Sequence, residues 1–363
     1  MKYPISVELV EKSRISEVDF SNLVFGRNIS DHMFVADYID GEWTDCRIVP
    51  YGPMLMSPAI MALHYGQAIF EGMKANKDAK TGVPLLFRPE MHIERINRSA
   101  VRMAMQPIPD EIFMNALNYL LDIDRAWIPE SEGSALYIRP HMFAIDATLG
   151  VKASDNYRFV IMTSPVGPYY PKPIRLLVSE KYVRAFPGGV GFAKAAGNYG
   201  ATLAPAAQAK EKGFDQILWL DGIEFKYLQE CGTMNIMCVI GDTVVTPNLT
   251  DTILAGITRD SILHLIRDLG LKIEERPISI FELIEANKSG ELKEMFGTGT
   301  AAVLSHVSEF SYKDEIYTLP PLEGRKVGPM IKKVLEDYKK GIQPDKFNWL
   351  VPVKKTMLSS SLK

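Results

Sequence analysis

The pattern of apolar and polar positions along the chain predicts a mixed α/β fold. Apolar side chains recur at roughly helical spacing in residues 91–103, 110–124 and 262–269, which indicates amphipathic helices. Short apolar runs bounded by turn-forming residues predict strands. We expect strands at residues 84–87, 135–139, 157–162, 174–178, 216–220, 224–228, 236–245 and 303–307, and further helices at residues 201–212 and 327–340. Such alternation is typical of an α/β arrangement.

Chain length and one proline-rich segment indicate two domains. A chain of 363 residues exceeds what a single hydrophobic core usually supports. Residues 165–173 contain four prolines in nine positions, which favours a linker. We therefore predict a small N-terminal α/β domain over residues 1–164, a linker over 165–173 and a large C-terminal domain over 174–363.

Composition and charge favour a cytoplasmic protein that acts on small molecules. Lys and Arg number 41 against 44 Asp and Glu, so no excess of positive charge indicates binding to nucleic acid or to an anionic membrane. The N-terminal residues resemble neither a secretory signal nor a transit peptide. The three cysteines and six histidines lack metal-ligand spacing, so no metal is expected, and a reducing compartment fits.

One lysine is distinctive because its neighbours are small and uncharged. Lys194 is the only charged residue from Ala185 to Ala209, and Gly and Ala dominate around it. Such a setting leaves room for a flat group and removes the solvation that keeps an ammonium protonated. A deprotonated lysine can attack a carbonyl and form a Schiff base. A lysine that snorkels beside a packed turn is the alternative.

An isolated carboxylate lies further along the chain. Glu230 is the only acid between Lys226 and Asp242, in an apolar strand setting. A carboxylate there is costly unless it meets a positive partner, and a pyridinium nitrogen would be such a partner. The alternative is a glutamate on an edge strand that points to water.

Two glycine-containing segments are candidate anion sites. Gly256 precedes a predicted helix, whose first N–H groups form a natural phosphate site. Residues 297–302 superficially satisfy the dinucleotide pattern G-x-G-x-x-A, but the residues that follow favour a strand and not a helix. We therefore favour an anion-binding turn built from Thr298, Thr300 and backbone N–H groups, with a plain structural turn as the alternative.

These motifs, in their order, resemble those of the branched-chain amino acid aminotransferases, which are fold type IV pyridoxal phosphate enzymes. The segments in the C-terminal half are 194–200 (KAAGNYG), 230–235 (ECGTMN), 256–259 (GITR) and 297–301 (GTGTA). Those in the N-terminal half are 25–26 (FG), 63–65 (LHY), 70–74 (FEGMK), 87–89 (FRP) and 136–140 (LYIRP). The resemblance covers nearly the whole chain. It implies a homodimer whose larger C-terminal domain is β-barrel-like with surrounding helices.

The resemblance also implies a role for each residue of the cofactor site. Lys194 would form the internal aldimine with pyridoxal 5'-phosphate and then move the proton between the substrate's α-carbon and the cofactor. Glu230 would keep the ring nitrogen protonated, and Tyr199 would bind the ring's phenolic oxygen. The phosphate would be held by the Arg88 side chain, the N–H groups of Ile257 and Thr258, and the Thr300 hydroxyl.

For the substrate, the resemblance implies an aromatic pocket with two anion contacts. The pocket would surround the aliphatic side chain of leucine, isoleucine or valine with Phe25, Tyr65, Phe70, Tyr137 and Tyr169. The N–H groups of Thr300 and Ala301 would receive the α-carboxylate, and Arg139 the distal carboxylate of glutamate. The implied reaction is a reversible, ping-pong transfer of the amino group to 2-oxoglutarate.

Two alternatives and one departure accompany this interpretation. A D-amino acid aminotransferase or an aminodeoxychorismate lyase would share the fold, but the long N-terminal segment and the pair Tyr137 and Arg139 count against both. A cofactor-binding protein without catalysis is disfavoured by the intact Lys194, Glu230 and Arg88. Animal members of the family carry a C-x-x-C redox pair where Ala302 and Ser305 stand here, so no thiol switch is expected at that position.

Overall fold

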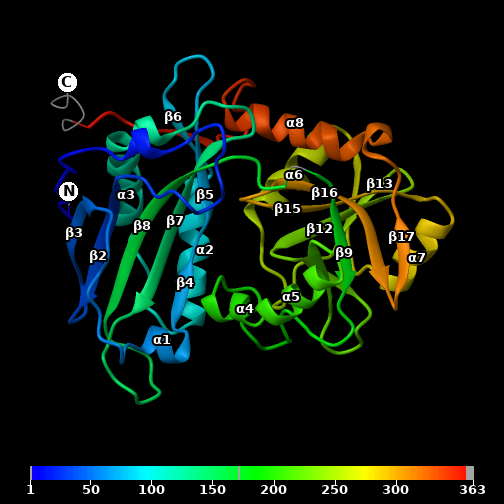
Figure 1. Cartoon of the computed structure of the whole chain (residues 1–363), viewed down its shortest axis with the longest axis horizontal. Helices are drawn as coiled ribbons and strands as arrows, with labels where there is room; N and C mark the ends of the chain where they lie inside the picture. Colours follow the sequence, from blue (N-terminus) through cyan, green and yellow to red (C-terminus); the bar gives the residue numbers. More distant parts are fainter. Residues whose placement is uncertain (1, 171, 357–363) are drawn as a thin grey trace. The chain divides into compact units, whose positions relative to one another are not determined.

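The structure, a computed structural model, describes residues 2–170 and 172–356, and it divides into two compact units. The first unit comprises Met1–Tyr169, Ala193–Ala196 and Asp337–Lys363. The second comprises Tyr170–Phe192 and Gly197–Glu336. The sequence prediction drew each domain as one continuous segment, whereas the chain returns twice to the first unit. Figure 1 shows the elements of both units.

The first unit is built on a mostly antiparallel sheet with the strand order β1-β3-β2-β8-β7-β5-β6-β18, and β4 pairs with β7. Its strands are β1 (Ser6–Val7), β2 (His32–Ile39), β3 (Glu42–Pro50), β4 (Ala68–Phe70), β5 (Met73–Lys77), β6 (Pro84–Phe87), β7 (Ala135–Ala144), β8 (Tyr157–Val166) and β18 (Leu350–Pro352). Its α-helices are α1 (Met61–Tyr65), α2 (Pro89–Arg102) and α3 (Asp110–Ile123), with short 3-10 helices at Ile15–Glu17 and Arg125–Trp127.

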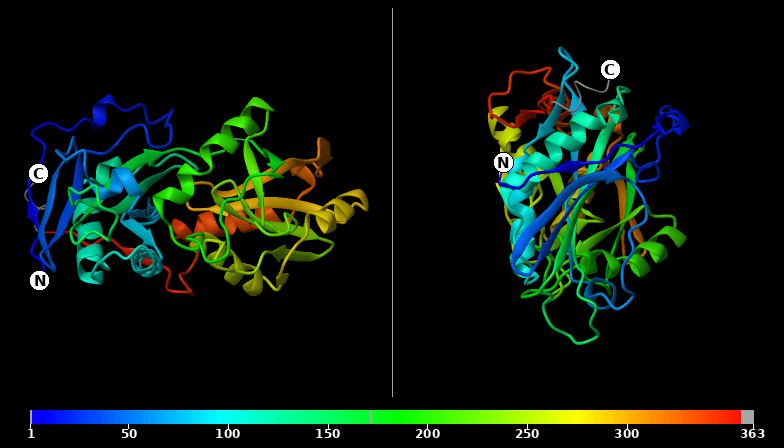
Figure 2. Two further views of the ribbon diagram at one scale, coloured as in Figure 1. Left: turned by 90° about the horizontal axis from the view of Figure 1, so that it is seen from below. Right: turned by 90° about the vertical axis from the view of Figure 1, so that its left-hand side faces the viewer.

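Helices α2 and α3 lie along one face of this sheet (Figures 1 and 2) and close the core of the first unit. In α2 the buried apolar positions Ile93, Ile96 and Ala100 fall on one side, at the spacing the sequence predicted. The ring of Phe113 in α3 stacks on Phe159 of β8, with 5.7 Å between the centroids. Burial of these faces is what holds the helices on the sheet.

The second unit is built on a sheet that closes into a barrel. Its strands follow the order β11-β10-β9-β16-β15-β12-β13-β14, β17 pairs with β16, and an additional pairing of β11 with β12 closes the ring. The strands are β9 (Ile174–Val178), β10 (Gln216–Leu220), β11 (Leu228–Cys231), β12 (Met234–Ile240), β13 (Thr243–Thr246), β14 (Lys272–Glu275), β15 (Leu292–Gly299), β16 (Val303–Tyr312) and β17 (Glu315–Thr318). A barrel-like second half was predicted, and this closure confirms it.

Helices surround this barrel (Figure 1). They are α4 (Ala196–Gly200), α5 (Leu203–Glu211), α6 (Ile257–Asp268), α7 (Ile280–Lys288) and α8 (Val327–Lys339), with a 3-10 helix at Leu322–Gly324. Of these, α4 begins and α8 ends in residues that belong to the first unit. Among the described residues, no helix is both long and apolar enough to cross a lipid bilayer.

Most predicted elements are present, and the differences occur at tight turns. Residues 224–228 were predicted as a strand, but β11 begins only at Leu228. The preceding residues form a turn because the Asp221 carboxylate accepts hydrogen bonds from the N–H groups of Ile223, Glu224, Lys226 and Tyr227. The single strand predicted over 236–245 is two strands, β12 and β13, since Gly241 turns the chain with a φ of 61°.

The predicted linker, residues 165–173, overlaps the end of a strand. Pro165 and Val166 belong to β8, where they pair with Leu136 and Ala135 of β7. Pro171 lies outside the described residues. Several short elements had no counterpart in the sequence prediction, among them the helices α1 and α7 and the strands β14 and β18, because their apolar positions do not form a long periodic run.

Candidate functional site

The backbone around Lys194 is held by residues of the first unit. The Lys194 N–H donates a hydrogen bond to Ser99 Oγ at 2.9 Å. The Lys194 carbonyl accepts one from the Phe70 N–H at 3.1 Å, and Ala195 forms a β-bridge with Ile69. Both flanking alanines are buried, while the lysine itself is half-buried. The small neighbours noted in the sequence therefore let this segment pack closely, with the lysine amine extending from it.

Several predicted substrate residues of the first unit form one cluster with this lysine. The Lys194 Nζ lies 4.7 Å from the centroid of the Phe70 ring, and the Arg139 guanidinium lies 4.7 Å from the same centroid. Arg139 also donates a hydrogen bond to Tyr137 Oη at 2.9 Å. The Phe25 ring meets the edge of Tyr137 at 4.8 Å and of Tyr169 at 5.0 Å. The cluster combines apolar ring faces with one amine and one guanidinium.

Tyr65 is the predicted pocket residue that the cluster leaves out. It ends α1, where its hydroxyl donates to the Leu149 carbonyl at 2.5 Å. Among the described residues, no ring contact or hydrogen bond joins it to Phe70 or Tyr137. Tyr65 is instead exposed, as are Leu63 of the same helix, Leu149, which its hydroxyl contacts, and two residues near these in the chain, Leu55 and Val151. We refer to these five residues as the exposed surface near α1.

A glycine sets the position of Tyr137 in the cluster. A Cβ on Gly72 would lie 2.1 Å from the Tyr137 hydroxyl oxygen, well inside van der Waals contact. Only a residue without a side chain therefore lets this hydroxyl occupy its place beside β5. The glycine of the segment 70–74 is in this way explained by packing.

Arg88 lies at the junction of β6 and α2, as the sequence predicted. It is the N-cap residue of α2 and has left-handed backbone angles, with φ 51° and ψ 49°. Its N–H donates to the Trp349 carbonyl at 2.7 Å, and its guanidinium lies 4.9 Å from the centroid of the Trp349 ring. Arg88 is 6% exposed. No local pattern in the sequence connects these two residues.

In the second unit, Glu230 is buried inside the barrel wall. It lies on β11, which pairs with β10 on one side and β12 on the other, and it is 3% exposed. Its Oε1 accepts a hydrogen bond from the Leu254 N–H at 2.7 Å and lies 3.1 Å from Arg184 Nη2. The alternative of an edge-strand glutamate facing water is therefore wrong. The positive partner that burial requires includes Arg184, which sequence reasoning missed.

Three neighbouring strands align Glu230 with two further polar residues. Glu230 pairs with Asn235 of β12, and Asn235 pairs with Thr298 of β15. Paired residues project to the same face of a sheet, so these side chains share one face of the barrel wall. Asn235 donates to the Leu254 carbonyl at 2.9 Å, and its Oδ1 would be 1.9 Å from a Cβ on Gly256. Asn235 thereby ties the start of α6 to the barrel.

The start of α6 and the turn after β15 both offer backbone N–H groups. Gly256 is the N-cap residue of α6 and has no side chain to cap the first turn, which contains Ile257 and Thr258. Residues 300–302 form the turn between β15 and β16, and Thr300 and Ala301 are half-buried there. The Thr298 hydroxyl is buried and has no hydrogen-bond partner among the described residues. Because a strand follows this turn, the dinucleotide-binding alternative is excluded.

Tyr199, the remaining predicted residue, lies on α4. Its side chain is half-buried, and its carbonyl accepts hydrogen bonds from the N–H and the hydroxyl of Thr202. The predicted residues thus divide between the units. The first unit contains Phe25, Tyr65, Phe70, Arg88, Tyr137, Arg139, Tyr169 and Lys194, and the second contains Tyr199, Glu230, Ile257, Thr258, Thr300 and Ala301.

A buried ionic group next to the lysine segment was not anticipated. The Glu71 carboxylate is fully buried and accepts hydrogen bonds from Arg95 Nε at 2.6 Å and Nη2 at 2.8 Å, and it contacts His92 Nδ1 at 2.7 Å. Burial raises the pKa of Glu71, but the charge of Arg95 outweighs this and holds the pKa well below its usual range. Burial also lowers the pKa of His92.

The sequence does contain a signal for this group. His92, Arg95 and Ser99 recur at the spacing of one helix face in α2, and Ser99 Oγ donates to the Arg95 carbonyl at 2.9 Å. That same oxygen accepts the Lys194 N–H. A polar stripe on an otherwise apolar helix face is therefore what marks the support of the lysine segment.

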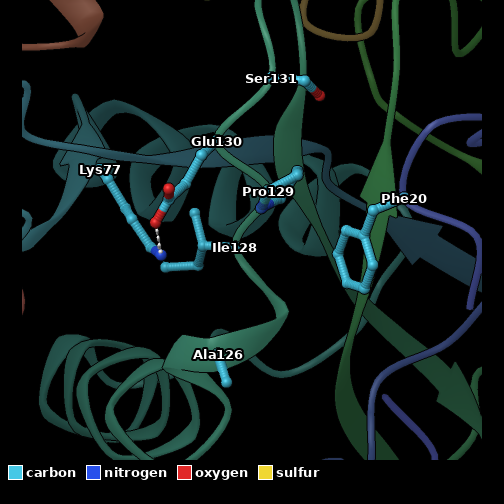
Figure 3. A pocket seen from close by; sticks show the side chains of 7 residues that line it. All are labelled: Phe20, Lys77, Ala126, Ile128, Pro129, Glu130 and Ser131. Atoms are coloured by element: carbon cyan, nitrogen blue, oxygen red, sulfur yellow. Dashed lines mark hydrogen bonds and ion pairs between the residues drawn. The ribbon is translucent and has the colours of Figure 1, made fainter. Parts of the chain in front are cut away.

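A separate pocket of about 350 Å³ lies in the first unit (Figure 3). Lys77 and Glu130 form an ion pair at 2.6 Å at one side of it. The lining residues are Phe20, Lys77, Ala126, Ile128, Pro129, Glu130 and Ser131. None of the predicted site residues lines this pocket, so it plays no part in the arrangement described above.

Comparison with known proteins places this geometry in context. Residues 68–310 match the model of the amino-transferase class IV family. The chain is 46% identical over 356 residues to branched-chain-amino-acid aminotransferase 2 of Bacillus subtilis, and the match covers 97% of this chain and 98% of that protein. The identity and the coverage are high enough to establish common ancestry over nearly the whole length.

Solved structures resemble the fold as well. A branched-chain aminotransferase from Thermoproteus uzoniensis, determined with norvaline, superposes with a TM-score of 0.75 at 25% identity and covers 89% of this chain and all of its own. The branched-chain amino acid aminotransferase from Escherichia coli gives a TM-score of 0.70 at 27% identity and covers 89% of this chain and 99% of its own. The predicted α/β fold of type IV is confirmed by these similarities.

Proposed function

The chain belongs to the class IV aminotransferases, and we propose that it transfers the amino group reversibly between L-leucine, L-isoleucine or L-valine and 2-oxoglutarate. The observation that carries this proposal is the cluster in the first unit, where Lys194 and Arg139 both lie over the ring of Phe70. An apolar wall with one fixed cation suits a site that must accept an aliphatic side chain and a carboxylate in turn.

The cofactor of this family is pyridoxal 5'-phosphate, and the residues present fit it. Three observations support the fit: a buried glutamate on the barrel wall, the uncapped first turn of α6 and the Thr298 hydroxyl without a partner among the described residues. When bound, the cofactor supplies a carbonyl that carries the amino group and a ring that accepts electrons. We assign its binding to Arg88, Lys194, Tyr199, Glu230, Ile257, Thr258 and Thr300.

Within this proposal the chain's own residues orient groups and move protons. The Lys194 amine would take the proton from the substrate's α-carbon and deliver it to the cofactor carbon that carries the amino group, and would do the reverse in the other half-reaction. Glu230 would keep the ring nitrogen protonated, and its contacts with Leu254 and Arg184 hold its carboxylate in one orientation. The phosphate would be bound by the N–H groups of Ile257 and Thr258, the Arg88 side chain and the Thr300 hydroxyl.

Recognition of two unlike substrates follows from the composition of the cluster. Phe25, Phe70 and Tyr137 offer ring faces that gain from contact with a branched aliphatic chain. Arg139 Nε is buried and has no hydrogen-bond partner among the described residues, so the guanidinium retains donors for the distal carboxylate of glutamate. We assign the α-carboxylate to the N–H groups of Thr300 and Ala301.

We further propose a homodimer in the cytoplasm. The exposed surface near α1 supports this assembly, because Leu55 is 99% exposed and Val151 is 80% exposed, and exposed apolar side chains gain from burial against a partner. A second copy of the chain would cover this surface and contact Tyr65 at its edge. Sedimentation of the purified protein tests the assembly, with Leu55→Lys and Leu63→Lys as the disrupting variants.

The decisive experiment for the activity is a visible spectrum of the purified protein with single substrates. L-leucine should bleach the absorbance band of the bound cofactor, and 2-oxoglutarate should restore it. A D-amino acid aminotransferase would respond to D-alanine instead, and a lyase to aminodeoxychorismate. A spectrum unchanged by L-leucine, D-alanine and aminodeoxychorismate would favour a binding protein without catalysis.

A further inference from the structure

We infer that Trp349 is a positioning residue that aims the Arg88 guanidinium at the cofactor phosphate. This inference rests on the proposed function, in which Arg88 is a phosphate ligand. Trp349 lies near the end of the chain and belongs to the part of the first unit formed by Asp337–Lys363. It contributes both a backbone and a side-chain contact to Arg88.

The backbone contact stabilises an unfavourable conformation. A φ of 51° places Arg88 in the left-handed region, which residues other than glycine rarely adopt. The Arg88 N–H donates to the Trp349 carbonyl at 2.7 Å, and the adjacent residues Phe87 and Leu350 are paired between β6 and β18. The C-terminal strand therefore holds the turn from which the arginine side chain emerges.

The side-chain contact restricts the guanidinium without using its donors. The Trp349 ring centroid lies 4.9 Å from the Arg88 guanidinium, and Trp349 is only 5% exposed. An arginine that stacks on an aromatic ring presents its flat face to the ring, so its N–H donors point outward in the guanidinium plane. That is the geometry in which an arginine binds a phosphate with two parallel hydrogen bonds.

The ring of Trp349 is itself fixed on several sides. Phe347 stacks on it with 4.4 Å between centroids, and Phe87 meets it edge-on at 5.5 Å. The Asp345 carboxylate accepts hydrogen bonds from the N–H groups of Trp349 and Leu350, each at 2.8 Å. Because these contacts restrict the ring, they also restrict the arginine that lies over it before any ligand binds, which lowers the entropic cost of binding.

The test compares two ligands that differ only in the phosphate. Cofactor-free Trp349→Leu and wild-type protein are titrated with pyridoxal 5'-phosphate and with pyridoxal, and binding is followed by visible absorbance. Loss of one buried cation–π contact should weaken the binding of pyridoxal phosphate by about ten-fold. Pyridoxal affinity should stay unchanged, and Trp349→Phe, which keeps a ring, should restore most of the loss.

The inference would be overturned if Trp349→Leu bound both ligands more weakly to the same extent, or if it bound both as tightly as the wild type does. Trp349→Met takes the place of the leucine variant if that protein does not fold. Trp43→Leu is the matched control, because Trp43 is another buried tryptophan of the first unit, and its indole N–H donates to the Pro107 carbonyl. That variant should unfold at a lower temperature, but its affinity for pyridoxal phosphate should not fall relative to its affinity for pyridoxal.

Arg88→Gln separates this inference from the proposed function. If Arg88→Gln leaves pyridoxal phosphate binding unchanged, the phosphate assignment itself fails. If Arg88→Gln weakens the binding of pyridoxal phosphate but not of pyridoxal, and Trp349→Leu does not, only the positioning role of Trp349 fails. When both hold, the double variant should bind no more weakly than Arg88→Gln alone, since Trp349 acts through the arginine.

Discussion

The two units hold their candidate site residues in different ways. In the first unit the residues contact one another through side chains, as Phe25, Tyr137 and Arg139 do. In the second unit they are tied to the backbone, as Glu230 is to Leu254 and Asn235 is to the Leu254 carbonyl. Side-chain clusters can be altered one residue at a time, whereas groups tied to the barrel backbone resist change. We therefore expect variants of the first unit to alter substrate choice and variants of the second to alter cofactor chemistry.

Lys194 and Arg88 are exceptions to this division, because both belong to the first unit and are assigned to the cofactor, and the loss of Lys194 should have the largest effect. Lys194→Ala should lower turnover of leucine with 2-oxoglutarate by at least about 10³-fold, because the variant lacks both the nucleophile and the proton carrier. The backbone contacts with Ser99 and Phe70 do not need the lysine side chain, so thermal unfolding should change little. Borohydride should no longer fix the cofactor to the protein. Continued fixation at another residue would refute the assignment.

Glu230→Gln tests the second unit. The amide can still accept the Leu254 N–H but carries no charge, so the rate constant kcat should fall by about 10²-fold or more. The KM for leucine should change far less, since no aliphatic contact is removed. Steady-state kinetics with leucine measure both constants. Equal rates for wild type and variant would exclude a role for this carboxylate.

Arg139→Ala tests whether a residue of the first unit affects the choice of substrate. Loss of a charge-assisted contact should reduce kcat/KM for 2-oxoglutarate by about 10- to 100-fold. The value for leucine in the same variant should fall much less, because its side chain contacts the rings instead. The ratio of the two values is the measurement, and a uniform loss would count against selective recognition by Arg139.

Gly72→Ala should have the smallest effect and sharpen the comparison further. The added methyl group would collide with the Tyr137 hydroxyl, and overpacking of this kind costs about 1–3 kcal/mol. We expect a lower midpoint of urea unfolding and a raised KM for leucine. The double variant Gly72→Ala with Tyr137→Phe removes the colliding oxygen and should recover both. Failure of this rescue would show that the glycine serves another purpose.

Local patterns in the sequence were sufficient to predict many of the helices and strands. The periodicity of residues 91–103 predicted α2, and apolar runs between turn formers predicted β6, β7 and β8 in the first unit and β9, β10 and β16 in the second. The sequence failed at residues 224–228, where the Asp221 carboxylate competes with strand pairing for four backbone N–H groups. Such a choice depends on which side-chain oxygen reaches the backbone, and apolar periodicity carries no information about it.

The sequence by itself determined which residues are chemically unusual. Lys194 stands out by its small neighbours, Glu230 by its isolation in an apolar run and Arg88 by its place between strand and helix. These are short-range properties, so a linear chain displays them.

Only the tertiary structure decided which partners support those residues. The pairing of β18 with β6 brings Trp349 to Arg88, and Arg184 meets Glu230 inside the second unit. Burial of the α2 face places the ionic group of Glu71 under the lysine segment. Register and burial are set by the whole of each unit at once, and no local window of the chain contains them.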